Sequence, residues 1–568
     1  MTVTSPLVTF GLYALQIKQD ATLACPDLQP FSSMTDLKSG SATTRPYITY
    51  EPDFWLLDGQ YKFKPTNNAA VHVGLMSLSM SNAAGVFAIP PVLTATFSEI
   101  HTTDGLTLHF SQYTNDYCND LTIAFYDATN VLIRSDAYNP ATWELSTGQA
   151  VTDFKKIVIT FNSTNKAYRY LRMVGIDFGQ LIYFTAADIK SCTVVEEFNP
   201  LSTELPVDTL DLKLFSSDAA FSIINPAGDY AALQNKQPLD VYENVGNDRI
   251  YIGQFFLSTW ENPSNTGISF KAIDMLGVLD TVPFSGYLGH SDWEILSIED
   301  FLNIKLGAIG VPYDLDTELL GVQLEGWIPA TSYREALQQV AFAAGAYVTC
   351  SRAGILQIFK TVLASEVVSQ DFDIPASAKG IDSSLTLKTL VTGVDVTAHN
   401  YVSNTDVTEL FKKTLAVGQY TIAFSEPHHD LIVTGAAFYF QDANYAIITV
   451  SSPGLITITG QGYTDTTQVY NITNGTLDAN VRQNVIAISD ATLINPSNVV
   501  ATTQRVYDYY QQRYLQKVKL YSPTAAVSDS VLIDTLYNQR ISGVVEKMNM
   551  DLSGGFRVNA EITGIVAP

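Results

Sequence analysis

The residues best suited to chemistry in this chain are its histidines and its paired acids, and their spacing forms no catalytic motif. The sequence contains no His-Glu-x-x-His helix for zinc, no Gly-x-Ser-x-Gly nucleophile turn and no phosphate loop ending in Gly-Lys-Ser or Gly-Lys-Thr. Gly460-Gln461-Gly462 lacks the third glycine and the following helix of a dinucleotide-binding turn. We therefore expect a protein that is not an enzyme, with no catalytic residues, no cofactor and no metal site.

Two local clusters leave alternatives open. The seven histidines are His72, His101, His109, His290, His399, His428 and His429. Only the last two are neighbours: on a strand they would point to opposite faces and could not share a metal, whereas in a turn they could. Glu196-Glu197 is an acid pair of the kind that glycosidases use, and the distance between the two carboxylates in space decides that question.

The composition excludes several partners. The chain has 568 residues, 32 lysines and arginines against 57 acids, and a net charge of −25. That balance argues against binding nucleic acid or an anionic membrane surface. Only 16% of residues are charged, although 46% are hydrophobic, and about 25% charged residues are typical. Either the cores are large or much of the surface is buried against other subunits.

The first twenty residues and the cysteines are those expected of a chain made in a reducing cytoplasm. No apolar run approaches the roughly 20 residues that span a bilayer, and residues 1–20 lack the features of a signal peptide. The four cysteines, Cys25, Cys118, Cys192 and Cys350, are widely scattered. We expect buried thiols and no membrane insertion by this chain.

From about residue 50 to 182 the pattern predicts a β-sandwich or jelly roll. Short segments alternate apolar and polar residues and are separated by turn residues. Five aromatic residues in this stretch are candidates for a glycan-binding surface: Trp55, Tyr113, Tyr117, Tyr138 and Trp143. Aromatic side chains in β proteins also serve as core and cross-strand residues, which is the structural alternative.

Residues 326–360 predict a helix followed by a hairpin. Ser332 and Glu335 have the spacing of a capping box. The small and apolar residues from Ala336 to Ala344 repeat at helical spacing, and Gly345 follows them where a left-handed C-cap is needed. Two β-rich segments then flank the turn residues 351–354. No catalytic residue lies in this stretch, which we interpret as scaffold.

This stretch is also where the chain resembles a known family. The run Trp327-Ile328-Pro329 with Ser332-Tyr333-Arg334-Glu335-Ala336-Leu337-Gln338 is similar to the helix-hairpin element of phage tail hub proteins, also called tail-associated or minor tail proteins, of Gram-positive prophages. Residues 237–243, 251–255 and 270–274 resemble the first barrel of such a hub, and residues 541–548 with 551–556 resemble its closing hairpin. Tyr168-Arg169-Tyr170-Leu171-Arg172 with Ile176-Asp177-Phe178-Gly179 is similar to the closing strands of galactose-binding-like sandwiches in tail proteins.

The resemblance and the pattern together give a mainly β, multidomain layout, with hub β-barrels, β-sandwich insertions and a small α/β helix-hairpin domain. We expect an N-terminal strand and loop at 1–48, which could belong to the first barrel, a galactose-binding-like sandwich at 49–185 and barrel 1 at 186–286. The helix-hairpin domain is expected at 287–362. Barrel 2 is expected at 363–412 and 478–568, with an inserted β-block at 413–477.

The resemblance implies a structural role in a virion, at the tail tip or baseplate. It implies a homotrimer whose barrels form a pseudo-sixfold ring that caps the tail tube, with DNA passing without specific binding. Implied partners are a distal tail or tail tube ring protein, a tape-measure protein and a spike or fibre protein. Such a channel is expected to be acidic, because a wall that binds phosphates would stall the DNA. The alternative function is a carbohydrate-binding adhesin that attaches the tail tip to host cell-wall glycans.

Overall fold

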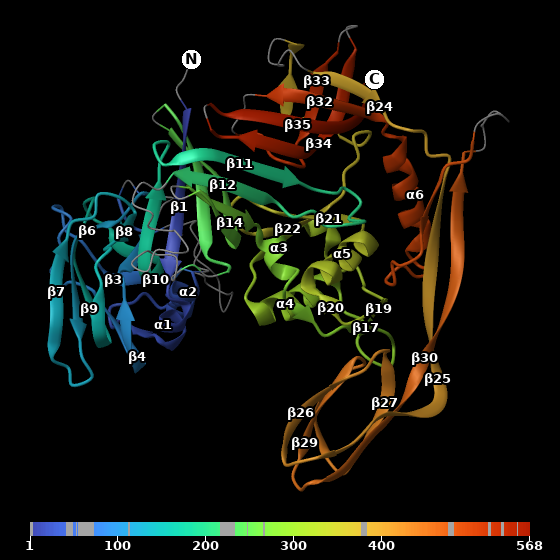
Figure 1. Ribbon diagram of the computed structural model, residues 1–568, viewed down its shortest axis with the longest axis horizontal. Coiled ribbons are helices and arrows are strands. Elements are labelled where there is room, and N and C mark those ends of the chain that lie inside the picture. Colours follow the sequence, from blue (N-terminus) through green and yellow to red (C-terminus); the bar gives the residue numbers. More distant parts are fainter. Residues whose placement is uncertain are drawn as a thin grey trace. The chain divides into compact units, whose positions relative to one another are not determined.

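The computed structural model describes residues 4–40, 49–52, 54, 73–111, 114–215, 233, 235–246, 248–264, 267–367, 369–376, 383–474, 482–520, 524–535, 539–553 and 555–567. The chain divides into two compact units, one containing residues 9–183 and the other residues 1–8 and 184–568. Most of the elements in both units are antiparallel strands (Figure 1). The mainly β, multidomain fold class is therefore confirmed. No helix in these ranges is long and apolar enough to cross a membrane.

Residues 9–183 form a β-sandwich. One sheet has the strand order β2-β4-β9-β6-β7; in the other, β10 pairs with β3 and β5, and β5 pairs with β8. The strands are β2 (Thr22–Ala24), β3 (Leu75–Met80), β4 (Val92–Thr103), β5 (Leu106–Phe110), β6 (Cys118–Tyr126), β7 (Leu132–Tyr138), β8 (Glu144–Ser146), β9 (Val151–Thr164) and β10 (Tyr170–Phe184), with the short helices α1 (Leu15–Asp20) and α2 (Met34–Ser39). Ile157, Ile159 and Phe161 of β9 are buried while the residues between them are partly exposed, as the period of a half-buried strand requires.

The larger unit is built around one antiparallel sheet with the strand order β24-β32-β35-β34-β11-β12-β15-β14, which we call the central sheet. Its strands are β11 (Ile189–Glu197), β12 (Thr209–Phe215), β14 (Asp248–Ser264), β15 (Gly267–Ile273), β24 (Ser384–Leu387), β32 (Tyr514–Leu520), β34 (Arg540–Asp551) and β35 (Arg557–Val566). In Figure 1, β11 lies directly beside β34, although about 350 residues of sequence separate them. This pairing joins the N-terminal and C-terminal groups of strands into one sheet.

Further strands pair with parts of the central sheet. On one side, β13 (Pro238–Val245) pairs with the first half of β14, and β1 (Thr4–Tyr13) lies next to β13. The amide of Phe556 donates to the hydroxyl of Thr4 at 3.0 Å, which connects the start of β1 to the C-terminal hairpin. On the other side, β33 (Ser530–Asp534) pairs with β34 and with β23 (Phe372–Ile374).

An α/β region follows β15. It contains α3 (Met275–Leu279), β16 (Pro283–Phe284), β17 (Tyr287–Gly289), α4 (Ile298–Ile309), β18 (Tyr313–Leu315), the 3₁₀ helix η2 (Thr317–Leu319), β19 (Gly326–Ile328), β20 (Thr331–Ser332), α5 (Tyr333–Ala344), β21 (Ala346–Cys350) and β22 (Leu356–Lys360). The predicted helix and hairpin are confirmed: the hydroxyl of Ser332 accepts from the amide of Glu335 at 3.2 Å, and Gly345 ends α5 with φ +74°.

Two helix boundaries differ from the sequence expectation. The sequence pattern predicts a helix over residues 292–306, but α4 begins at Ile298, where the hydroxyl of Ser297 accepts from the amide of Asp300. The pattern also predicts a helix over residues 502–515, whereas α6 (Val499–Gln511) ends earlier and β32 begins at Tyr514. Local capping decides the first boundary, and pairing of β32 with β24 and β35 decides the second.

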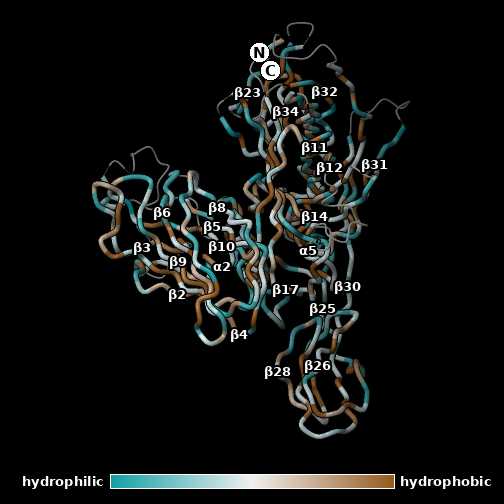
Figure 2. The backbone as a smooth tube through the Cα atoms, turned by 60° about the vertical axis from the view of Figure 1, so that its left-hand side comes forward, coloured by the Kyte–Doolittle hydropathy of each residue, from teal (hydrophilic) through white to brown (hydrophobic). Residues whose placement is uncertain are grey.

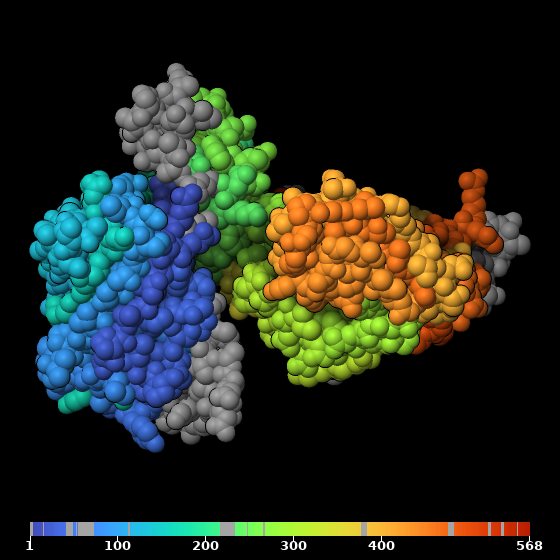
Figure 3. Space-filling view, turned by 90° about the horizontal axis from the view of Figure 1, so that it is seen from below, coloured from blue at the N-terminus to red at the C-terminus, as the bar shows by residue number. Residues whose placement is uncertain are grey.

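A long two-stranded ribbon leads from α6 to a small β-block (Figures 1 and 2). The ribbon consists of β25 (Gly393–Leu415) and β30 (Gly454–Thr473), with β31 (Val485–Ile488) beside its first part. The block adds β26 (Gly418–Ala423), β27 (His428–Thr434), β28 (Ala437–Gln441) and β29 (Tyr445–Val450). Figure 3 shows the block in orange against the α/β region in green. Two indoles of the α/β region donate hydrogen bonds to the block: Trp293 to the carbonyl of His428 at 3.2 Å, and Trp327 to Asn444 Oδ1 at 2.8 Å.

Candidate functional site

One face of the central sheet is apolar and buried, and the other is polar. Successive strand residues point to opposite faces, so each strand contributes alternate residues to each side. The buried side holds Cys192, Val194, Leu210, Leu212, Ile268, Phe270, Ala272, Val518, Met548, Met550, Val558, Ala560 and Ile562. The opposite side, which we call the polar face, is partly or fully exposed over most of its area and runs without a break from β24 to β14.

The register of the strands places opposite charges next to one another on the polar face. Lys517 on β32 lies opposite Glu561 on β35, and Glu561 lies opposite Lys547 on β34. Lys547 in turn lies opposite Glu197 on β11. The ammonium of Lys517 is 2.6 Å from Glu561, and that of Lys547 is 2.6 Å from Glu197. A row of alternating charges therefore crosses the junction between β34 and β11.

A second row repeats this arrangement further along the strands. Arg557 lies opposite Asp551, and Asp211 lies opposite Lys271. Thr193 lies between Asp551 and Asp211. All told, the polar face carries the bases Lys213, Lys271, Lys517, Lys519, Lys547 and Arg557 and the acids Glu197, Asp211, Glu261, Asp551 and Glu561. This near balance contrasts with the excess of acids over the whole chain.

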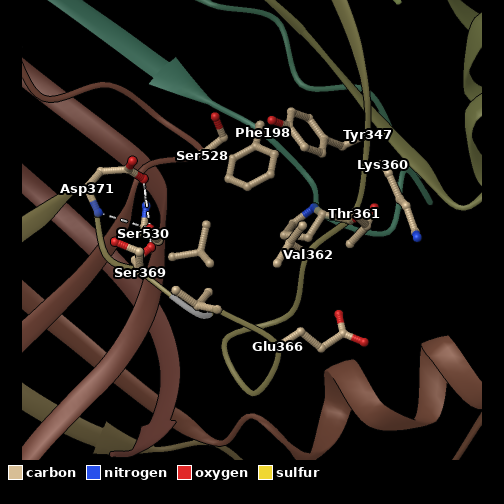
Figure 4. Close-up of a pocket in the computed structure, with 13 residues that line it drawn as sticks. Phe198, Tyr347, Lys360, Thr361, Val362, Glu366, Ser369, Asp371, Ser528 and Ser530 are labelled. Carbon is tan, nitrogen blue, oxygen red and sulfur yellow. Dashed lines mark hydrogen bonds between the residues drawn. The ribbon is translucent and has the colours of Figure 1, made fainter. Parts of the chain in front are cut away.

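A cavity of about 360 Å³ lies on another part of this unit (Figure 4). The rings of Phe198 and Tyr347 form one wall, with centroids 5.0 Å apart. The carboxylate of Asp371 accepts from the amide and the hydroxyl of Ser530, at 2.9 and 2.7 Å. None of the thirteen residues that line the cavity is a histidine or a cysteine. The carboxylate of Asp371 is therefore already held by protein donors.

The predicted glycan-binding aromatics are not brought together as one exposed surface by the described residues. Trp55 and Tyr113 lie outside the described residues. Tyr117, Tyr138 and Trp143 are each half-buried and pack against the core of the sandwich. Packing against the core is the structural alternative to glycan binding that the sequence analysis gives for these aromatic residues. A glycan site at these residues stays a prediction.

The two local clusters considered for chemistry are separated by their strands. His428 and His429 lie on β27, where neighbouring side chains point to opposite faces; the ring of His428 bonds the carbonyl of Glu426, and that of His429 lies 3.2 Å from Asp430. Glu196 is buried and pairs with Arg352 at 2.8 Å, whereas Glu197 lies on the polar face. The described residues include no group of three or more His, Cys, Asp or Glu arranged to hold a metal.

The four cysteines are free thiols. Cys25, Cys118 and Cys192 are buried and Cys350 is partly buried. Burial raises the pKa of Cys118 to about 12. Such thiols are protonated at neutral pH and are poor nucleophiles.

The sandwich contains a charged network centred on His109. Its ring lies 3.0 Å from Asp177 and 3.1 Å from Glu144, and Lys18 lies 2.7 Å from the other oxygen of Asp177. Burial alone would lower the pKa of His109, but hydrogen bonds to the two carboxylates outweigh it and raise that pKa to about 10. Burial alone would raise the pKa of Asp177, yet the bond to His109 and the charge of Lys18 lower it to about 2. The network thus holds a charged imidazolium between α1, β5, β8 and β10.

This network predicts a specific pH dependence of stability. The pKa of His109 is higher in the folded protein than in the unfolded chain, where it is about 6.5, so protonation of His109 stabilises the fold. This stabilisation is complete below about pH 6.5 and is lost as the pH rises toward 10. Wild type should therefore be more stable than His109→Gln at pH 6, with the difference shrinking by at most about 1.4 kcal/mol per pH unit above pH 7. Denaturant unfolding of both proteins at pH 6–10 measures this, and a difference that does not change with pH would contradict it.

The polar face was missed by the sequence reasoning. The signal was present in part, because Lys517 and Lys519 of β32, and also Asn549 and Asp551 of β34, alternate with apolar residues. What the sequence could not supply was the register. Lys547 and Glu197 are 350 residues apart in sequence, so nothing local indicates that they pair.

Comparison with known proteins gives structural neighbours only. No protein-family model matches this chain, and no curated protein sequence matches it significantly. The 43 kDa tail protein of prophage MuSo2 from Shewanella oneidensis is similar with 10% identity and a TM-score of 0.40, over 68% of this chain and 95% of that protein. The prophage tail protein gp18 from Listeria monocytogenes is similar with 9% identity and a TM-score of 0.38, over 67% of this chain and 91% of that protein.

A third solved structure is of another kind. The family 32 CBM of NanJ from C. perfringens, solved in complex with galactose, is similar with 10% identity and a TM-score of 0.18. The match covers 31% of this chain and 99% of that module. These three neighbours are two prophage tail proteins and one module that was solved in complex with galactose.

Proposed function

We propose that this chain is a structural component of the tail tip of a phage or of a phage-tail-like particle. In this proposal it forms a trimeric hub that caps the tail tube, connects the tube to spike or receptor-binding parts and forms part of the DNA channel. The observation that carries the proposal is the central sheet, which runs unbroken from the N-terminal strands to the C-terminal strands and has one continuous polar face. The resemblance of residues 326–338 to tail hub proteins supports it.

The two ends of the central sheet suit pairing between copies. Along the described residues, β24 pairs only with β32, and beyond residue 258 β14 pairs only with β15. Every neighbouring pair in the sheet is antiparallel, and the number of strands from β24 to β14 is even, so these two edges run in opposite directions. Rotation about an axis along the strands would therefore bring β24 of one copy antiparallel to β14 of the next.

The width of such a ring favours three copies. Three central sheets of eight strands would close twenty-four strands into a barrel. Barrel diameter grows with strand number, and barrels of about 16–18 strands already enclose an aqueous channel. In this arrangement the polar face lines the lumen, because the opposite side of the central sheet is apolar and buried.

Native mass tests the proposal. Light scattering of the purified chain across a concentration series should give three times the monomer mass of 62.2 kDa at high concentration, with rings in negative-stain images of the same samples. The same chain as a monomer at every concentration contradicts the ring.

The alternative function, attachment to host cell-wall glycans, would be carried by the sandwich at residues 9–183. A monomer that sediments with host cell walls and is released by free galactose would favour this adhesin over the hub. The distal tail or tube ring, tape-measure and spike partners follow only from the hub.

A further inference from the structure

Four of the six bases on the polar face, Lys271, Lys517, Lys547 and Arg557, lie directly opposite acids on neighbouring strands. Lys517 and Lys547 have their ammonium groups 2.6 Å from carboxylates. Lys271 and Arg557 are exposed and lie directly opposite acids in the register. Directly opposed residues on neighbouring strands have Cβ atoms about 5 Å apart, within reach of an ion pair.

The balance on this face departs from the chain as a whole. With 32 bases and 57 acids in total, a face drawn from the average composition would be strongly acidic. The polar face instead carries the six bases and five acids named above. Bases therefore gather here, and acids are placed opposite them.

We propose that Glu197, Asp211, Asp551 and Glu561 neutralise the bases of the polar face, so that a DNA duplex passes along it without being retained. The inference rests on the proposed function, since it assumes that this face lines the channel. It revises the acidic wall expected from the sequence: the wall is nearly charge-balanced, and four of its six bases lie opposite acids on neighbouring strands.

The physical reason lies in how proteins hold DNA. Affinity for the phosphate backbone comes from lysines and arginines that displace condensed counterions, and each neutralised phosphate contributes about 0.9 to the slope of log affinity against log salt. A base that is already paired with a carboxylate must give up that partner before it can contact a phosphate. The two ion pairs, together with the two acids opposed to Lys271 and Arg557, should therefore weaken the attraction of this face for DNA while keeping it hydrated and polar.

The test removes the acids and keeps their shape. The variant Glu197→Gln, Asp211→Asn, Asp551→Asn and Glu561→Gln frees the bases opposite them, and because all four acids are partly exposed the amides should be tolerated. A matched control changes four exposed or partly exposed acids elsewhere by the same total charge: Glu299→Gln, Glu318→Gln, Asp406→Asn and Glu409→Gln. Near-UV circular dichroism establishes that each protein is folded.

Binding of a short linear DNA duplex is then measured by fluorescence anisotropy at salt concentrations from about 50 to 200 mM. The face variant should bind at least about tenfold more tightly than wild type at the lowest salt, with a slope steeper by about 3 to 4 from four freed bases. The control should bind as weakly as wild type.

Two results would overturn the inference. One is a face variant that binds no better than the control, because the acids would then not be what prevents retention. The other is a wild-type chain that already binds the duplex tightly with a steep salt dependence. Light scattering on the same samples separates these outcomes from failure of the proposed function: the mass reports whether rings form, and anisotropy reports whether the acids neutralise the face.

Discussion

Replacement of Arg352 by alanine is expected to lower the free energy of unfolding by about 3 kcal/mol, because it leaves buried acids without their counter-charge. Arg352 lies in the turn between β21 and β22. Its guanidinium contacts Glu196 at 2.8 and 3.2 Å and donates to the carbonyl of Ala525 at 2.7 Å. The side chain of Glu196 is only 6% exposed. One turn of the α/β region therefore connects β11 to the chain segment that precedes β33.

Two further acids near Arg352 enlarge this effect. Burial raises the pKa of Asp208 well above its ordinary value, the nearby charge of Asp274 adds to this, and Arg352 opposes it. Burial also raises the pKa of Asp529, to about 6, and Arg352 again opposes the shift. Without Arg352 both acids should be harder to ionise in the folded protein. An acid with a raised folded-state pKa makes folding less favourable at every pH above its unfolded-state pKa. Wild type and variant lose this stability in parallel up to the wild-type folded-state pKa, so the deficit of the variant should grow as the pH rises above about 6, the pKa of Asp529 in wild type.

Denaturant unfolding at pH 5 and pH 7 measures both the loss and its pH dependence. Lys412→Ala, which removes an exposed partner of Glu409, is the control and should cost less than about 1 kcal/mol. The double variant Arg352→Met with Glu196→Leu should recover at least half of the loss, because an apolar pair needs no counter-charge. An Arg352→Ala protein as stable as the control would show that the contacts of Arg352 with Glu196 and Ala525 do not stabilise the fold.

Local signals predicted the parts of the fold that depend on nearby residues. Helix α5 and its hairpin were predicted correctly because the signals for the helix are local. The cap at Ser332, the small apolar stripe and Gly345 all lie within fourteen consecutive residues. The start of α4 was missed because apolar residues before Ile298 continue the helical pattern, whereas the bond from Asp300 to Ser297 defines the actual start.

Features that depend on long-range register were not predictable in the same way. Alternation in β34 and β35 indicates which residues share a face, yet it does not say which strand lies alongside. The pairing of β34 with β11 decides that Lys547 meets Glu197, and a shift of one residue would instead have placed Glu196 there. The candidate site therefore follows from the topology of the sheet and could be described only once that topology was known.

The edge strand β24 gives the second large prediction. Leu385 and Leu387 are 46% and 55% exposed, and both belong to the side of β24 that turns away from the polar face. Exposed apolar residues on an unpaired edge are unfavourable for an isolated chain unless another strand covers them. Replacement of both by lysine should leave the fold unchanged and weaken ring formation by about 100-fold, since lysine on an edge opposes strand pairing and would have to be desolvated at the contact.

Light scattering across a concentration series measures this shift as a displacement of the trimer midpoint. A matched control places two lysines at exposed apolar positions away from the central sheet, Leu320→Lys and Val500→Lys, which are 48% and 61% exposed in wild type. The control should assemble as wild type does. A β24 variant that assembled at the wild-type midpoint would contradict the prediction. The contact between copies would then lie elsewhere on the chain, and the proposed antiparallel pairing of β24 with β14 would be wrong even for a chain that forms trimers.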